Sequence, residues 1–189
     1  MAQSRRLRAI EPGAPPTSPQ TVMLGSVPII PVPSALARRF QQVCVAAMAE
    51  CLAEVDMTPL QYAAFPFLRD EPALDQAGLA ARIGIDRTNA GLLVDYLEQR
   101  GFVERRIDSS DRRARRLYLT PRGVRFHDRI RPAATKVQQE ILGCLTAAER
   151  ETLLSLLIRV LQANESLARP GLSRRNRRIA SPPVRSASK

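Results

Sequence analysis

The chain has 189 residues, which suits one globular domain with flanking segments, and 44% of them are hydrophobic, enough for a modest core. Its formal net charge is +11. With one histidine, three cysteines and no Gly-x-Gly-x-x-Gly, Gly-x-Ser-x-Gly or Cys-x-x-Cys motif, it offers neither a disulfide framework nor the motifs of common enzymes. We therefore expect no enzymatic activity, no cofactor and no metal. Because no stretch of eighteen apolar residues occurs, we also expect a soluble cytoplasmic protein.

Positive charge is concentrated in two segments. Residues 82–131 contain thirteen arginines against seven acidic residues, and residues 168–189 contain six arginines and one lysine with no acid. Such clusters neutralise nucleic-acid phosphates and release counterions, which drives binding. Residues 1–34 are rich in proline, and we predict that they form a disordered arm. We also predict a disordered basic tail at 168–189. The folded domain is predicted between the arm and the tail, at 35–167.

The first elements predicted in chain order are two helices. Apolar residues recur every three or four positions over 36–55, which indicates a helix with one buried face. Thr58-Pro59 opens a second helix, with threonine as N-cap and proline at the first helical position. Pro66 falls inside this second pattern, where a proline removes a hydrogen bond, so we expect a kink or an early end.

A helix-turn-helix follows over 74–101. Asp75 is expected to cap its first helix, and Gly84 to make the turn. Asp86 is expected to cap the second helix, and Gly101 to supply its left-handed stop.

Two alternating strands at 102–107 and 115–120 then enclose an arginine-rich tip. Thr120-Pro121 opens a long helix, and the capping box that begins at Thr146 opens the last one. The fold class predicted is mainly α with a small β-wing: a winged helix-turn-helix, with its DNA-binding lobe at about 58–120.

The start of the second helix of the motif is the expected reading element for double-stranded DNA. Residues near the N-terminus of such a helix meet base edges in the major groove, so Arg87, Thr88 and Asn89 are the candidates for base or phosphate contact. Ordinary first-turn capping is the alternative for Thr88 and Asn89. Gly91 is expected to allow close approach to DNA.

The wing tip supplies the second set of candidates. Arg112 or Arg113 is expected to enter the minor groove, with Asp111 holding the arginine in position, and Arg115 is expected to meet phosphates. The alternative is a solvated charged hairpin. It is disfavoured because six arginines between 105 and 116 repel one another unless an anion is near.

Several of these motifs occur together in one known family. The runs are Leu60-Gln61-Tyr62, Gly84-Ile85-Asp86-Arg87-Thr88, Asp111-Arg112-Arg113-Ala114 and Leu117-Tyr118-Leu119-Thr120-Pro121. In this order they resemble the MarR family over residues 36–167. The resemblance implies a homodimer, joined through its terminal helices, that represses genes at a pseudo-palindromic operator until a small ligand releases it. Leu92 stands where this family often carries a polar or basic residue.

The resemblance also implies a ligand site between the dimerising helices and the DNA-binding lobe. Arg38, Arg39 and Tyr62 are candidates for an anionic group, and Phe65 for an apolar wall. The region around Arg38 and Arg39 resembles members that sense aromatic acids or their coenzyme A thioesters.

Two alternatives stay open. Some relatives sense peroxides through a cysteine of the first helix, where Cys44 and Cys51 lie, although small buried side chains are the favoured interpretation of both. A less specific architectural DNA-binding protein would also suit the basic ends.

Overall fold

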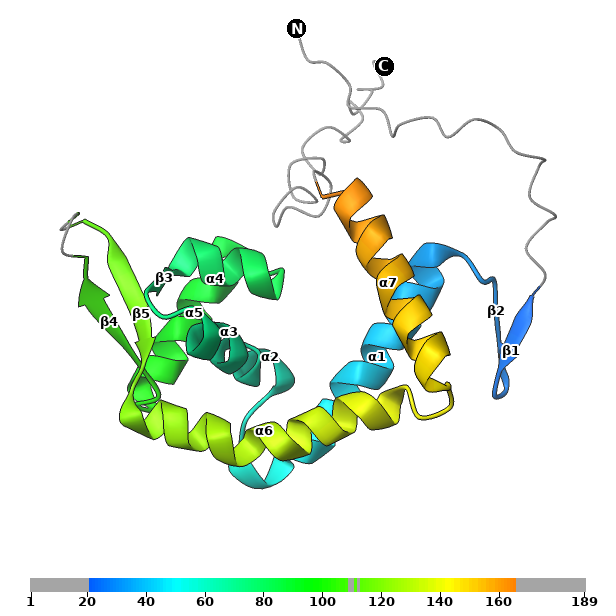
Figure 1. The fold of residues 1–189 in the computed structure, drawn as a ribbon, viewed down its shortest axis with the longest axis horizontal. Coiled ribbons are helices and arrows are strands. Elements are labelled where there is room, and N and C mark those ends of the chain that lie inside the picture. Colours follow the sequence, from blue (N-terminus) through cyan, green and yellow to red (C-terminus); the bar gives the residue numbers. More distant parts are fainter. Residues whose placement is uncertain (1–20, 109–110, 112, 166–189) are drawn as a thin grey trace, which may run out of the picture. The chain divides into compact units, whose positions relative to one another are not determined.

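The computed structural model describes residues 21–108, 111 and 113–165 (Figure 1). The chain forms two compact units, residues 1–43 and residues 44–189, and helix α1 (Pro33–Leu52) crosses from the first into the second. None of the helices in the described part of the chain is long and apolar enough to cross a membrane.

The first unit contains a short β-hairpin within the arm that was predicted to be disordered. Strands β1 (Val22–Leu24) and β2 (Val27–Ile29) pair antiparallel. Gly25, in the two-residue turn between them, has a φ of +60°, a conformation that glycine adopts without strain. A glycine in a two-residue turn between apolar runs is a hairpin pattern, which the surrounding prolines obscured in the sequence. Residues 1–20 and the predicted tail at 168–189 lie outside the described residues.

Side-chain caps open the helices of the second unit where the sequence predicted them. The capping residues are Thr58, Asp75, Asp86, Thr120 and Thr146, and each accepts a hydrogen bond from a backbone N–H three residues later. The helices that they open are α2 (Pro59–Tyr62), α4 (Gln76–Ile83), α5 (Arg87–Gln99), α6 (Pro121–Ile141) and α7 (Ala147–Ala163). These predictions are confirmed. Such caps can be predicted from sequence because each depends on residues only three positions apart.

The predicted second helix is broken in two, as its proline indicated. The 3-10 turn η1 (Ala53–Val55) follows α1, then α2 ends at Tyr62, and α3 (Ala64–Asp70) begins after Ala63. Pro66 is the third residue of α3, where the backbone N–H of any residue would lack a partner within the helix. The proline therefore costs this short helix no hydrogen bond.

The helix-turn-helix and the wing lie side by side in the second unit (Figure 1). Gly84 ends α4 with a φ of +80°, and Gly101 follows α5 with a φ of +69°. Strands β4 (Val103–Ile107) and β5 (Arg115–Leu119) form the predicted wing, with Val103 opposite Leu119. Strand β3 (Leu74–Asp75), which was not predicted, pairs with the other edge of β5 and ties the entry of α4 to the wing.

One hydrophobic core joins these elements. Its fully buried side chains come from α1, α3, α4, α5 and the wing, and the largest are Leu52, Phe65, Leu68, Leu79, Val94, Leu97, Val103 and Leu117. The stripe predicted for α5 is confirmed, since Leu93, Val94 and Leu97 are all buried. This packing fixes the outer face of α5.

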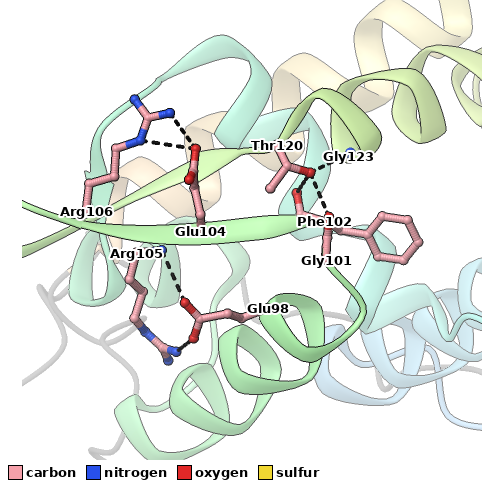
Figure 2. A network of polar contacts seen from close by, with 8 residues as sticks. All are labelled: Glu98, Gly101, Phe102, Glu104, Arg105, Arg106, Thr120 and Gly123. Atoms are coloured by element: carbon pink, nitrogen blue, oxygen red, sulfur yellow. Dashed lines mark hydrogen bonds and ion pairs between the residues drawn. The ribbon is translucent and has the colours of Figure 1, made fainter.

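The wing is attached to α6 by a tight junction (Figure 2). The Thr120 hydroxyl donates to the Gly101 carbonyl (2.7 Å) and accepts from the Gly123 amide (3.1 Å). A Cβ on Gly123 would lie 2.1 Å from the Phe102 carbonyl oxygen, so the backbones approach more closely than any other residue allows.

Helix α7 presents apolar side chains that the described residues of this chain leave exposed. None of its residues is buried. The exposed large apolar side chains are Leu154, Leu156, Leu157, Ile158, Val160 and Leu161.

Candidate functional site

The N-terminus of α5 presents three polar side chains to solvent. Arg87, Thr88 and Asn89 are all exposed, as the sequence predicted. Asp86 accepts from the Asn89 backbone N–H (2.9 Å) and from its side-chain amide (3.1 Å). Asn89 therefore takes part in the cap, and its side chain keeps a carbonyl oxygen and a second N–H for another partner.

Two other residues of α5 bear on this surface. Gly91 is half-buried, and a Cβ there would lie 3.3 Å from Nε2 of Gln76 in α4. It therefore has a packing role between the two helices, and its predicted approach to DNA stays a prediction. Leu92 is 65% exposed, so an apolar side chain stands among the polar ones on the outer face of the helix.

Three of the wing arginines already have carboxylate partners within the chain. Arg105 pairs with Asp95 and Glu98 on one side of β4, and Arg106 pairs with Glu104 on the other (Figure 2). Arg116 donates to Asp108 at 2.5 Å, and this hydrogen bond raises the pKa of its guanidinium. These three arginines therefore do not need an external anion, contrary to the prediction for all six.

The tip of the wing carries the other candidates. An Asp111 carboxylate oxygen accepts from the backbone N–H of Arg113 (2.9 Å), and the Asp111 carbonyl accepts from Ala114. Asp111 thus shapes the turn through the backbone of Arg113, a local role that supports the expected positioning. Arg113 and Arg115 are exposed, while Arg112 lies outside the described residues.

A cavity of about 660 Å³ lies between the α2–α3 segment and α6. Its walls combine apolar and charged groups, among them Met48, Tyr62, Phe67, Arg69, Asp70, His127, Asp128, Arg131 and Ala134. The volume falls within the range that small organic ligands occupy in proteins.

Tyr62 and His127 form a neutral polar pair in the cavity wall. The Tyr62 hydroxyl and His127 Nδ1 lie 3.4 Å apart, and both residues are buried. Burial raises the pKa of Tyr62 to about 12 and lowers the pKa of His127 below its usual value of 6.5. At neutral pH the two side chains therefore offer hydrogen bonds without charge.

The formal charges in this cavity balance, because its wall carries Arg69 and Arg131 against Asp70 and Asp128. Arg69 pairs with Asp128 at 3.7 Å. Arg131 forms no ion pair with any residue in the described ranges, so its guanidinium is the cation in this wall that can meet a ligand anion. Arg131 was not among the ligand residues predicted from the sequence. The available signal was its position four residues after His127, which puts both on one helix face.

The predicted ligand residues are only partly brought together. Tyr62 lines the cavity, and its contact with a ligand stays a prediction. Phe65 does not line it, because this ring is fully buried and packs on Tyr62, Phe102 and Phe126 in the core. Arg38 and Arg39 are exposed on the part of α1 in the first unit, and their role stays a prediction.

The cysteines offer little support for a redox site. Cys44 and Cys51 are half-buried free thiols, and burial raises the pKa of Cys44, which disfavours the reactive thiolate. Among the described residues, no group of three or more His, Cys, Asp or Glu side chains could hold a metal ion.

The chain is similar in sequence to known transcriptional regulators. Residues 55–114 match the model of the MarR family. A protein of Thauera aromatica, named as a transcriptional regulator for the hcr operon, is 35% identical over 104 residues. That match covers 55% of this chain and 63% of the relative, so the chain spans less than two thirds of the relative's length.

Solved structures match over more of the fold. The transcriptional regulator PcaV of Streptomyces coelicolor, in complex with its natural ligand, is 33% identical with a TM-score of 0.65, over 74% of this chain and 99% of that one. CouR, a transcriptional repressor bound to a 23-mer DNA duplex, is 30% identical with a TM-score of 0.63, over 68% and 92%. BpsR of Bordetella bronchiseptica, whose DNA binding is regulated by 6-hydroxynicotinic acid, is 26% identical with a TM-score of 0.66, over 72% and 97%.

Proposed function

Because this chain belongs to the MarR family of DNA-binding transcriptional regulators, we propose that it acts as a homodimeric repressor that a small aromatic acid releases from its operator. The observation that carries the ligand part of this proposal is the cavity between α2–α3 and α6, with Arg131 as its available cation. The DNA part depends on the exposed N-terminus of α5.

We propose that α5 reads the major groove through Arg87, Thr88 and Asn89. All three are exposed, and the Asp86 cap fixes the backbone from which they extend. Leu92 adds an apolar group on the same helix, and apolar side chains recognise the methyl group of thymine. This combination favours a specific sequence over a merely basic surface.

The tip of the wing supplies the second set of proposed DNA contacts. We propose, as from the sequence, that Arg112 or Arg113 enters the minor groove and that Arg115 meets phosphates, while Arg105, Arg106 and Arg116 pair with carboxylates of this chain. The paired arginines stiffen the stem of the wing, which supports insertion of its tip.

Dimerisation is supported by the apolar surface of α7. A soluble monomer seldom exposes a contiguous apolar patch as large as six such side chains on one helix would make. We propose that a second copy of this chain covers this surface. A twofold dimer would read half-sites about 10 base pairs apart.

A benzoate-type acid suits the cavity near Tyr62. One guanidinium balances one carboxylate, the neutral Tyr62–His127 pair can hold a hydroxyl or ring nitrogen, and Met48 and Phe67 supply apolar contacts. A coenzyme A thioester would place its acyl group in the same cavity.

The first experiment selects bound duplexes from a random library and measures affinity for the enriched sequence and a scrambled control. We expect a palindrome bound at least a thousandfold more tightly than the control. Light scattering should give a dimer. Absence of any enriched sequence would favour the architectural alternative and overturn the proposal.

Release is tested on the selected duplex with 4-hydroxybenzoate, 6-hydroxynicotinate and an aryl coenzyme A thioester. An aryl acid or thioester should weaken operator binding, while hydrogen peroxide should leave it unchanged. If peroxide alone weakens it, and a Cys44→Ser variant is insensitive, the redox alternative replaces the ligand proposal.

A further inference from the structure

A second cavity, of about 730 Å³, lies on a different face of α6. We call it the arginine cleft. Its walls come from η1, the connection between α5 and β4 and the first half of α6, and they comprise Glu54, Val55, Arg100, Phe102, Arg122, Arg125, Phe126, Arg129 and Ile130. It shares no lining residue with the cavity near Tyr62.

The cleft is remote from the proposed base contacts. Arg100 follows the last residue of α5, whereas Arg87 is its first. A helix of thirteen residues is about 20 Å long, so the arginine cleft lies at the opposite end of the reading helix from the major-groove surface. DNA contact by α5 therefore does not account for these arginines.

Aromatic rings hold three of the guanidinium groups in place. Arg122 lies over the Phe102 ring at 4.9 Å, Arg129 over Phe126 at 5.5 Å, and Arg100 over Phe102 at 5.8 Å from the centroid. The Phe102 and Phe126 rings pack together, with their centroids 4.7 Å apart, and both are buried in the core. A guanidinium that stacks on a ring keeps its N–H edges free for a ligand, so the core holds a preformed set of donors.

The charge of the cleft is unbalanced. Arg100 pairs with Asp56 at 3.4 Å, and Glu54 is the acidic residue in the lining. Across the described ranges, no carboxylate forms an ion pair with Arg122, Arg125 or Arg129. These three are spaced three and four residues apart on α6, so they lie on one helix face and repel one another.

We propose that the arginine cleft binds an organic polyphosphate of nucleotide size. Three guanidinium groups without carboxylate partners match an anion of two or more negative charges, which a polyphosphate supplies and an aromatic acid does not. Arginine also matches the geometry of phosphate oxygens, and the volume leaves room for an organic group that stacks on a guanidinium plane.

Titration calorimetry of the full chain with ADP, and separately with tripolyphosphate, tests this site. We expect one site per protomer for each probe. The double variant Arg122→Gln, Arg125→Gln should bind at least tenfold more weakly. The matched control Lys136→Gln, Arg159→Gln removes the same charge from exposed positions on α6 and α7 and should bind within twofold of the parent.

Other outcomes would overturn the proposal. They are no binding of either probe at millimolar concentration, an equal loss in the control, or full binding by the cleft variant, which would place the anion on the basic segments elsewhere in the chain. A lower operator affinity in the cleft variant, with a salt slope reduced by about two, would instead assign the cleft to DNA phosphates. Arg125→Gln, which removes no ring contact, repeats the test if the double variant unfolds.

Discussion

The two cavities beside α6 differ in charge more than in size. In the cavity near Tyr62, Arg69 pairs with Asp128 and a neutral Tyr62–His127 pair lies alongside, so one arginine is available. In the arginine cleft, several guanidinium groups share aromatic supports and face little negative charge. One helix thus presents a site suited to a weak monoanion with an apolar body and another suited to a polyanion. The number of cations left without a carboxylate partner, more than cavity volume, decides the class of ligand.

The largest expected effect comes from the junction that positions the first half of α6 beside both cavities. Gly123→Ala places a methyl group against the Phe102 carbonyl, where 2.1 Å is far too short, so the junction must open. We expect a loss of about 2–3 kcal/mol in the free energy of unfolding, measured by urea denaturation. The control Gln139→Ala, at an exposed position of α6, should change it by less than about 0.5 kcal/mol. A loss below about 0.5 kcal/mol for Gly123→Ala would show that the junction yields easily.

Removing Arg131, the available cation of the cavity near Tyr62, should weaken ligand binding there and leave binding at the arginine cleft unchanged. Arg131→Gln should weaken binding of the releasing aryl acid by about 10- to 100-fold, the cost of a charge-assisted hydrogen bond. Binding of tripolyphosphate should stay within twofold, because Arg131 does not line the arginine cleft. Calorimetry with both ligands checks this. Equal losses for both would mean that overall positive charge, not local geometry, drives binding.

Breaking the ion pair of the first cavity should make the two sites more alike. Asp128→Asn releases Arg69, so the cavity gains a second available cation. Because both partners are about half exposed, we expect a modest gain, about two- to fivefold tighter binding of a dicarboxylate probe relative to benzoate. Asp95→Asn, which removes a carboxylate of α5 that pairs with Arg105 of the wing, is the control. Weaker dicarboxylate binding would contradict the charge argument.

The smallest effect is a pH dependence of stability that only the first cavity carries. Burial lowers the pKa of His127 from 6.5, so the unfolded chain takes up this proton more readily than the folded one. His127 therefore gives its full contribution above about pH 6.5, and this contribution is lost as pH falls from there toward the folded-state pKa. Glu71 and Glu149, whose pKa values lie below 4.5, titrate at lower pH.

Denaturation at several pH values between 5 and 7.5 measures this slope in the parent and in His127→Gln. The variant should lose the slope, whatever its absolute stability. A slope that persists in the variant would assign the proton uptake to another group.

Local chemistry explains what could be predicted from the sequence. The caps at Asp86, Thr120 and Thr146, and the glycine stop at Gly101, depend on residues within one helical turn. The exposed positions of Arg87, Thr88 and Asn89 follow from the buried stripe of α5. These local signals are enough to predict the MarR-type order of helices and wing strands.

Interactions between distant residues explain the rest. Tyr62 and His127 are 65 positions apart, and Arg131 gains its role only when α6 packs against α2 and α3. Phe65 was predicted to form an apolar wall of the ligand site because aromatic residues suit such a site. Its ring is instead fully buried in the core.

By itself, then, the sequence determined the order of the helix-turn-helix and the wing strands, the caps that open five helices and the exposed start of α5, because hydrophobic periodicity and capping act over three or four residues. Only the tertiary structure decided which charges remain available. The wing stem neutralises Arg105 and Arg106 through carboxylates on α5 and β4, whereas the face of α6 at Arg122, Arg125 and Arg129 has no such partner in the described residues. The physical reason is that a charged side chain is neutralised by opposite charges within a few ångströms. Tertiary packing, not proximity in the sequence, decides which charged groups come that close.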